Sequence, residues 1–250
     1  MTPKPLEPFG GEVEGFDLAE PGGASPGDVR RAVARHKVLV LRGQTCDARQ
    51  FAAFLASMGE PMFTEGETPV DNAPNLNIVT NEGRTTPPRS VFHTDTSYVA
   101  HPPAITALLA IELPRSGGQT LFCDQAATLA GLPSPWRDCL RDRQAEHAAG
   151  PRDTAREAAH HPLVLAHPET GEEALYITTP ERCARISGLS DQDAARITSA
   201  LYRRSIRPGR LYRHTWRAGD VVLWDNRLTM HRADHSAVDG TRTLYRGMIR

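Results

Sequence analysis

Two distant stretches of the chain carry side chains of the types that bind transition metals. His93 and Asp95 lie two positions apart, and His231 follows much later. On an extended strand, side chains at positions i and i+2 point to the same face, so we expect His93 and Asp95 to project side by side. With His231 they would complete a set of two imidazoles and one carboxylate. Such a set holds Fe(II) on one face and leaves the opposite positions open for other ligands.

The tripeptide His-x-Asp is weak evidence when it stands alone. The chain has 10 histidines among 250 residues, and chance alone gives about 0.6 matches of this kind. A surface histidine and aspartate joined by a loose hydrogen bond is therefore an alternative interpretation of this motif. The choice between the two depends on what the rest of the chain supplies.

Composition limits the classes of partner. The 250 residues, 39% hydrophobic and 24% charged, are typical of a soluble globular protein with a sizeable core. A formal net charge of −1 predicts no nucleic-acid partner and no anionic membrane partner. The four scattered cysteines form no C-x-x-C pair, the N-terminal residues lack a secretory signal, and no apolar run is long enough to span a bilayer. We expect a cytoplasmic protein, and the sequence is compatible with a monomer or a homo-oligomer.

The elements that must position the candidate ligands read as a β-rich core with helices on its outside. Apolar runs and turn residues predict strands at 11–18, 38–41, 76–79, 105–113, 120–123, 221–224 and 243–246, and a hairpin of 163–165 with 174–177. Capping residues and apolar stripes predict helices at 25–35, 47–58 and 190–203, and two helical pieces within 125–143. We predict a mainly β, α+β fold in one domain over residues 1–250.

Residues 62–90 form a long, proline-rich segment that runs directly into His93. Long irregular segments within a compact domain commonly carry function. We therefore predict that this segment is an active-site lid.

Several ordered motifs together resemble a known family. They are His93-Thr94-Asp95, Gly117-Gly118-Gln119-Thr120-Leu121, and Trp224-Asp225-Asn226-Arg227 followed by His231, Arg242 and Arg246. In this order they are similar to the taurine dioxygenase and 2,4-dichlorophenoxyacetate dioxygenase-like family of Fe(II)- and 2-oxoglutarate-dependent oxygenases. The similarity runs from about Val38 to Arg250.

The resemblance implies a double-stranded β-helix (a jelly-roll, cupin-like core) with metal ligands His93, Asp95 and His231 and no further catalytic group. It also implies that Thr120 and Arg242 bind 2-oxoglutarate, because a planar guanidinium matches the distal carboxylate of that molecule. Fe(II), 2-oxoglutarate and O2 would be the cofactor and co-substrates. Related halogenases have a small residue at the position of Asp95, so the resemblance favours hydroxylation, desaturation or epoxidation, with release of succinate and CO2.

The same resemblance places substrate contacts at Arg246, Tyr98 and Arg89, with Phe92 as a further apolar wall. It departs from taurine dioxygenase itself, since Arg89 stands where that enzyme has an asparagine, and residues 61–72 contain no histidine. These residues favour a small carboxylate or sulfonate other than taurine.

Two alternatives use the same residues. One is a metal-binding β-barrel that has lost turnover, although such a barrel would not need His93, Asp95, His231 and Arg242 together. The other is a zinc hydrolase, because histidine and aspartate also bind Zn(II). The chain contains no H-E-x-x-H motif, which argues against the second.

Overall fold

The computed structural model describes residues 1–20, 22, 24–64, 66–83, 90–150 and 157–250. Its largest sheet has the strand order β1-β2-β3-β15-β7-β17-β6-β5, with β4 paired to β17. The strands of this sheet are β1 (Lys4–Pro5), β2 (Gly11–Val13), β3 (Val38–Leu41), β4 (Pro61–Met62), β5 (Pro69–Val70), β6 (Ala73–Thr80), β7 (Ile105–Glu112), β15 (Val221–Asp225) and β17 (Thr243–Ile249). Only the β2–β3 pair is parallel among those of the described strands.

A second sheet of β14 (Leu211–His214), β8 (Thr120–Asp124) and β16 (Thr229–Ala233) faces the first. The two sheets enclose an apolar cluster that contains Val40, Leu108 and Trp224 from the large sheet and Phe122 and Tyr212 from the small one. This arrangement, and the likeness to solved structures reported below, confirm the predicted double-stranded β-helix core.

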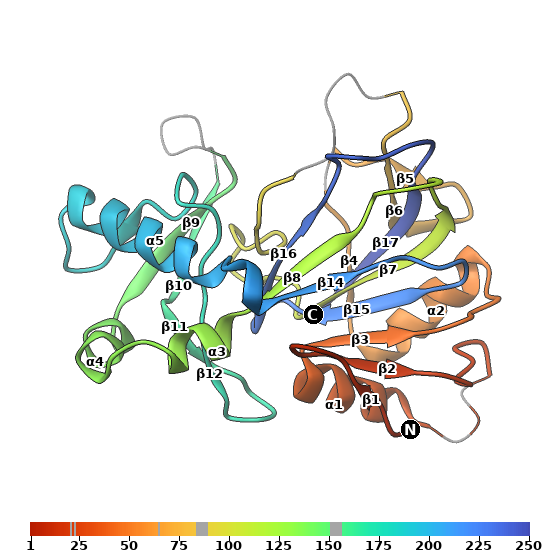
Figure 1. Ribbon diagram of the computed structural model, residues 1–250, viewed down its shortest axis with the longest axis horizontal. Coiled ribbons are helices and arrows are strands. Elements are labelled where there is room, and N and C mark those ends of the chain that lie inside the picture. Colours follow the sequence, from red (N-terminus) through yellow and green to blue (C-terminus); the bar gives the residue numbers. More distant parts are fainter. Residues whose placement is uncertain (21, 23, 65, 84–89, 151–156) are drawn as a thin grey trace.

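The outer face of the large sheet is covered by α1 (Pro26–His36) and α2 (Ala48–Met58) (Figure 1). The position of β3 between the helices and the second sheet explains why its sequence is apolar throughout. Leu39 and Leu41 pack with the helices, whereas Val38 and Val40 face the second sheet. A strand buried on both faces reads as a continuous apolar run.

The remaining elements form a region that extends to the left in Figure 1. It consists of α3 (Gln125–Ala130), α4 (Ser134–Arg141), β9 (Gln144–Ala148), β10 (Ala158–Pro162), β11 (Val164–Ala166), β12 (Glu173–Leu175), β13 (Arg185–Ile186), α5 (Asp191–Ser205) and a 3-10 helix (Pro208–Arg210). Strands β11 and β12 pair as the predicted hairpin. None of the helices in the described part of the chain is long and apolar enough to cross a membrane.

Two predictions about elements were wrong in detail. The opening strand predicted at 11–18 ends at Val13. The segment 62–90 contains the eight-residue strand β6 and the short strand β5, so it is less irregular than predicted.

Candidate metal centre and its cavity

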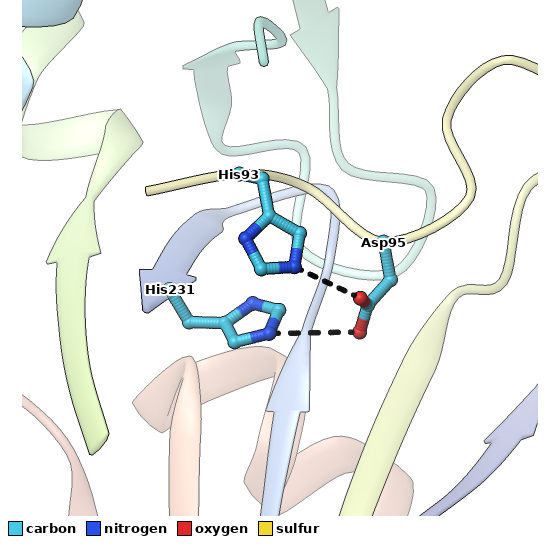
Figure 2. A group of neighbouring side chains, drawn as sticks. All are labelled: His93, Asp95 and His231. Atoms are coloured by element: carbon cyan, nitrogen blue, oxygen red, sulfur yellow. Dashed lines mark ion pairs between the residues drawn. The ribbon is translucent and has the colours of Figure 1, made fainter. Parts of the chain in front are cut away.

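The three predicted ligand residues lie together at one mouth between the sheets. One ligand atom from each of His93, Asp95 and His231 lies within 4.8 Å of the others. Figure 2 shows both imidazoles directed at the carboxylate, with His93 Nε2 3.4 Å from Asp95 Oδ1 and His231 Nε2 3.8 Å from Asp95 Oδ2. The structure therefore brings together residues that are more than 130 positions apart.

The backbone around these residues differs from the predicted strand. His93 forms an isolated antiparallel bridge with His231, in which each backbone N–H donates to the other residue's carbonyl, at 2.9 and 3.0 Å. Asp95 already lies in a turn, and the next residue, Thr96, has a positive φ of 44°. The expectation that an extended strand aligns His93 and Asp95 was wrong, because a bridge followed by a tight turn does so instead.

Hydrogen bonding and burial prepare both imidazoles to offer a lone pair. His93 Nδ1 lies 2.9 Å from the carbonyl of Val91, which requires a proton on Nδ1 and leaves Nε2 as the acceptor. Burial lowers the pKa of His231 to about 3, so this ring is neutral at neutral pH.

The carboxylate of Asp95 is ionised despite its burial. Burial by itself would raise the pKa of this group, but its polar surroundings, Arg246 among them, bring it below its ordinary value. Two imidazole nitrogens beside an ionised carboxylate oxygen are the donor set that non-haem Fe(II) sites use. The three residues therefore fit a divalent transition metal.

A cavity of about 320 Å³ opens from these ligands and is bounded by residues of both sheets and of the segment after β4. Arg242 lines this cavity and is only 2% exposed. Its Nε donates to the carbonyl of Gly118 at 2.9 Å and its Nη2 to Thr120 Oγ1 at 3.3 Å. In the described part of the chain, no carboxylate lies within ion-pair distance of this guanidinium.

Several features hold Arg242 in that place. Burial lowers the pKa of Arg242 to about 10, so the group is still a cation at neutral pH. The guanidinium lies 5.8 Å from the ring centre of Trp216, which supplies a cation–π contact. An added Cβ at Gly118 would lie 2.9 Å from Arg242 Cδ, so the Gly117-Gly118 turn makes room for this side chain.

The hydroxyl of Thr120 has a proton to spare. Its oxygen accepts from Arg242 and, at 3.1 Å, from Trp216 Nε1, and both of these groups can only donate. The Thr120 proton is therefore available to an acceptor in the cavity that Thr120 lines. A bound carboxylate would receive donors from both Arg242 and Thr120.

Arg246 lines the same cavity but has an acidic neighbour. Its Nη2 lies 3.4 Å from Glu67 Oε1, and its Nε is buried without a hydrogen-bond partner. The facing residue on β6, Asn77, is fully buried, and neither polar atom of its amide has a partner among the described residues. Sequence reasoning missed both Glu67 and Asn77, since neither belongs to a recognisable motif.

The other predicted substrate contacts divide into three cases. Tyr98 lines the cavity as expected. Phe92 does not line it and packs instead with the apolar cluster of the α3–α5 region, so its predicted place was wrong. Arg89 lies outside the described residues.

The motif Trp224-Asp225-Asn226-Arg227 serves two separate places. Asp225 Oδ2 accepts from Arg227 Nη2 at 2.6 Å and lies 2.9 Å from His167 Nε2 in the β11–β12 hairpin. The buried contact between His167 and Asp225 attaches the hairpin to the end of β15, so His167 has a packing role. Trp224 and Asn226 point instead toward the metal ligands, and no role for these two side chains was predicted.

Comparison with known proteins gives one consistent family. The family model described as taurine catabolism dioxygenase TauD, TfdA family matches residues 2–248. The alpha-ketoglutarate-dependent sulfate ester dioxygenase of Pseudomonas putida is 30% identical over 90% of this chain and 81% of its own length. The alpha-ketoglutarate-dependent 2,4-dichlorophenoxyacetate dioxygenase of Burkholderia sp. (strain RASC) is 28% identical, with coverage of 95% and 90%. A crystal structure of a taurine dioxygenase from Burkholderia xenovorans is similar with a TM-score of 0.87 at 30% identity, over 99% of this chain and 88% of the other.

Proposed function

The chain belongs to the taurine catabolism dioxygenase TauD, TfdA family, and from that premise we propose that His93, Asp95 and His231 bind Fe(II) while Arg242 and Thr120 bind 2-oxoglutarate. It is an enzyme of the 2-oxoglutarate-dependent dioxygenase class. The observation that carries the assignment is the cavity itself, which is lined by a metal-donor set and by the buried guanidinium of Arg242, with no carboxylate of the described residues at ion-pair distance from that guanidinium.

The proposed overall reaction consumes 2-oxoglutarate, O2 and a substrate C–H bond. One oxygen atom enters the succinate that forms as CO2 leaves, and the other enters the substrate as a hydroxyl group. Desaturation or epoxidation would use the same oxidant with a different outcome at the substrate. Iron bound here with 2-oxoglutarate supplies the oxidising chemistry, and the protein binds and orients the reactants.

Each protein group has a distinct task in this proposal. The imidazoles of His93 and His231 and the ionised carboxylate of Asp95 would hold the metal at the cavity wall. Arg242 and Thr120 bind the far carboxylate of 2-oxoglutarate, which sets the direction of its other end toward the metal ligands. Val79, Leu108 and Trp224 add apolar surface to the cavity lining.

We propose a small organic anion as substrate, since the named relatives act on a sulfate ester and on 2,4-dichlorophenoxyacetate. Arg246 is the cation that would receive its acidic group, with Tyr98 as a wall, and Arg89 stays a prediction. Glu67 lies where that acidic group must approach Arg246, so binding requires Glu67 to move away or to meet a donor on the substrate. The active-site lid over 62–90, the single domain and the cytoplasmic location stay predictions.

The test is production of succinate by the Fe(II)-loaded protein with 2-oxoglutarate and O2, across a panel of small sulfate esters, sulfonates, aryloxyacetates and carboxylates. We expect at least one of these to raise succinate formation above the substrate-free rate. Asp95→Ala should abolish both rates, whereas Asp234→Asn, which changes an aspartate outside the cavity, should leave them unchanged. Absence of succinate with every substrate would contradict the proposal, and hydrolysis by the Zn(II)-loaded protein would favour the hydrolase alternative.

A further inference from the structure

A chain of three hydrogen bonds ends on the carboxylate of Asp95. Trp224 Nε1 donates to Asn226 Oδ1 at 3.0 Å, and Asn226 Nδ2 donates to Thr106 Oγ1 at 2.8 Å. Thr106 Oγ1 in turn donates to Asp95 Oδ2 at 2.9 Å. Trp224, Asn226 and Thr106 are each at most 1% exposed, so water does not compete for these bonds.

The direction of every bond in this chain is determined by its first member. An indole nitrogen can only donate, so Asn226 must present its oxygen to Trp224 and its amide nitrogen to Thr106. The amide nitrogen also only donates, so Thr106 accepts there. The one hydroxyl proton of Thr106 is left for Asp95 Oδ2, which accepts it as an ionised carboxylate.

We propose that Trp224, Asn226 and Thr106 are positioning residues that hold Asp95 in one orientation, with Oδ2 engaged by Thr106 and Oδ1 presented to the metal. This inference rests on the metal site of the proposed function. Oδ1 faces His93 Nε2 at 3.4 Å, and Oδ2 faces His231 Nε2 at 3.8 Å while it accepts from Thr106. The Thr106 bond occupies one lone pair of Oδ2, so Oδ1 is the oxygen that stays more open to a metal.

Trp224 also contacts a second ligand residue. Its ring centre lies 4.5 Å from that of His231, so one side chain packs against an imidazole and starts the chain that reaches the carboxylate. Strand geometry makes this arrangement compact, since Trp224 on β15 is directly paired with Thr106 on β7. One pair of neighbouring strands therefore orients two of the three metal ligands.

The experiment measures Mn(II) affinity of the full-length protein by calorimetry and by the electron paramagnetic resonance signal of free Mn(II), with 2-oxoglutarate absent. Thr106→Val keeps the shape of the side chain and removes the hydroxyl, while Thr106→Ser keeps the hydroxyl. Loss of a partner that orients a metal ligand weakens metal binding by about 10- to 100-fold. We expect that loss in Thr106→Val and an affinity within about threefold of the wild type in Thr106→Ser.

A matched control separates positioning from general loss of stability. Thr128 in α3 is equally buried and its Oγ1 donates to the carbonyl of Asp124 at 2.7 Å. Thr128→Val should lower the melting temperature of the metal-free protein about as much as Thr106→Val does, but it should leave Mn(II) affinity unchanged. Asn226→Asp gives a second test, because an aspartate there would accept the Thr106 proton and leave Asp95 Oδ2 without it, so Mn(II) affinity should fall as in Thr106→Val.

The outcomes discriminate clearly. Thr106→Val with wild-type Mn(II) affinity would overturn the inference and leave the proposed function standing. Equal weakening by Thr106→Val and Thr128→Val would overturn it too, because the effect would then be structural. Absence of Mn(II) binding by the wild-type protein would overturn the metal site and this inference together.

Discussion

Arg242 and Arg246 lie four positions apart and line one cavity, yet their surroundings are opposite. Arg242 is 2% exposed and bonds to the carbonyl of Gly118 and the hydroxyl of Thr120, both neutral acceptors. The side chain of Arg246 is 17% exposed and faces the carboxylate of Glu67. Among the described residues, Arg242 thus has no carboxylate at ion-pair distance, whereas Arg246 has one.

This difference indicates which anionic group each arginine suits. Burial of a charge without a counter-ion costs several kcal/mol, which a fold tolerates where an anion is to bind. Arg242 fits a co-substrate that is the same in every turnover, because its place and direction are fixed before binding. Arg246 fits the acidic group of a substrate that binds and dissociates, because Glu67 neutralises the charge of Arg246 while no substrate is bound.

The largest expected effect is the loss of the buried cation. Arg242→Ala should weaken 2-oxoglutarate binding to the Mn(II)-loaded protein by about 150- to 5000-fold, because removing one partner of a buried charge pair costs about 3–5 kcal/mol. Calorimetry measures this directly. Arg246→Ala is the matched control and should change 2-oxoglutarate affinity by less than about threefold. A similar loss of 2-oxoglutarate affinity in both variants would contradict the distinction between Arg242 and Arg246.

The complementary experiment tests whether Arg246 binds the acidic group of the substrate. Arg246→Ala should raise KM for an anionic substrate by about 10- to 100-fold, because a partly exposed charge-assisted contact contributes about 1.5–3 kcal/mol. KM for 2-oxoglutarate should stay at its wild-type value. Steady-state succinate assays with each reactant varied in turn measure both constants. An unchanged substrate KM would place the acidic group of the substrate elsewhere.

A smaller effect should follow from removing the Thr120 hydroxyl. Thr120→Val deletes the proton that points into the cavity and an acceptor of Arg242, and should weaken 2-oxoglutarate binding about fivefold, the worth of one hydrogen bond of about 1 kcal/mol. Thr120→Ser should restore most of the affinity. If valine bound 2-oxoglutarate as tightly as threonine, the hydroxyl would have no part in binding.

The smallest expected effect concerns Glu67. Glu67→Gln removes the carboxylate that competes for Arg246, so KM for an anionic substrate should fall about threefold, in line with the modest worth of a partly exposed ion pair. The affinity for 2-oxoglutarate should not change. A rise in substrate KM would mean that Glu67 itself contacts a hydrogen-bond donor on the substrate, and the competitive role would be wrong.

The sequence predicted the metal-donor residues and two of the residues on the substrate side, Arg246 and Tyr98, but it did not predict the groups around Arg246. His93, Asp95, His231, Arg242 and Thr120 belong to ordered motifs, and the fold brings all five to one cavity. Glu67 and Asn77 belong to none. Glu67 lines the cavity from the segment before β5, and Asn77 lies beside Arg246 because β6 pairs with β17, a pairing between distant segments that local sequence patterns do not specify.

The backbone conformation around the three metal-ligand residues was also not fully predictable. The alternation rule correctly placed His93 and Asp95 together but for the wrong reason, since a bridge and a turn replace the strand. Strand β16, which carries His231, was not predicted because its Thr-Met-His-Arg-Ala sequence lacks a continuous apolar run. Its extended form comes from pairing with β8, which is tertiary context overriding a weak local preference.

The most direct test of the central claim is an anaerobic titration of the Fe(II)-loaded protein with 2-oxoglutarate, followed by visible absorption. We predict a weak metal-to-ligand charge-transfer band that saturates with 2-oxoglutarate in the wild type and in Arg246→Ala, and that needs at least about 100-fold more 2-oxoglutarate in Arg242→Ala. No band at saturating iron and 2-oxoglutarate in the wild-type protein would contradict the account, because His93, Asp95 and His231 would then not form an oxygenase metal site.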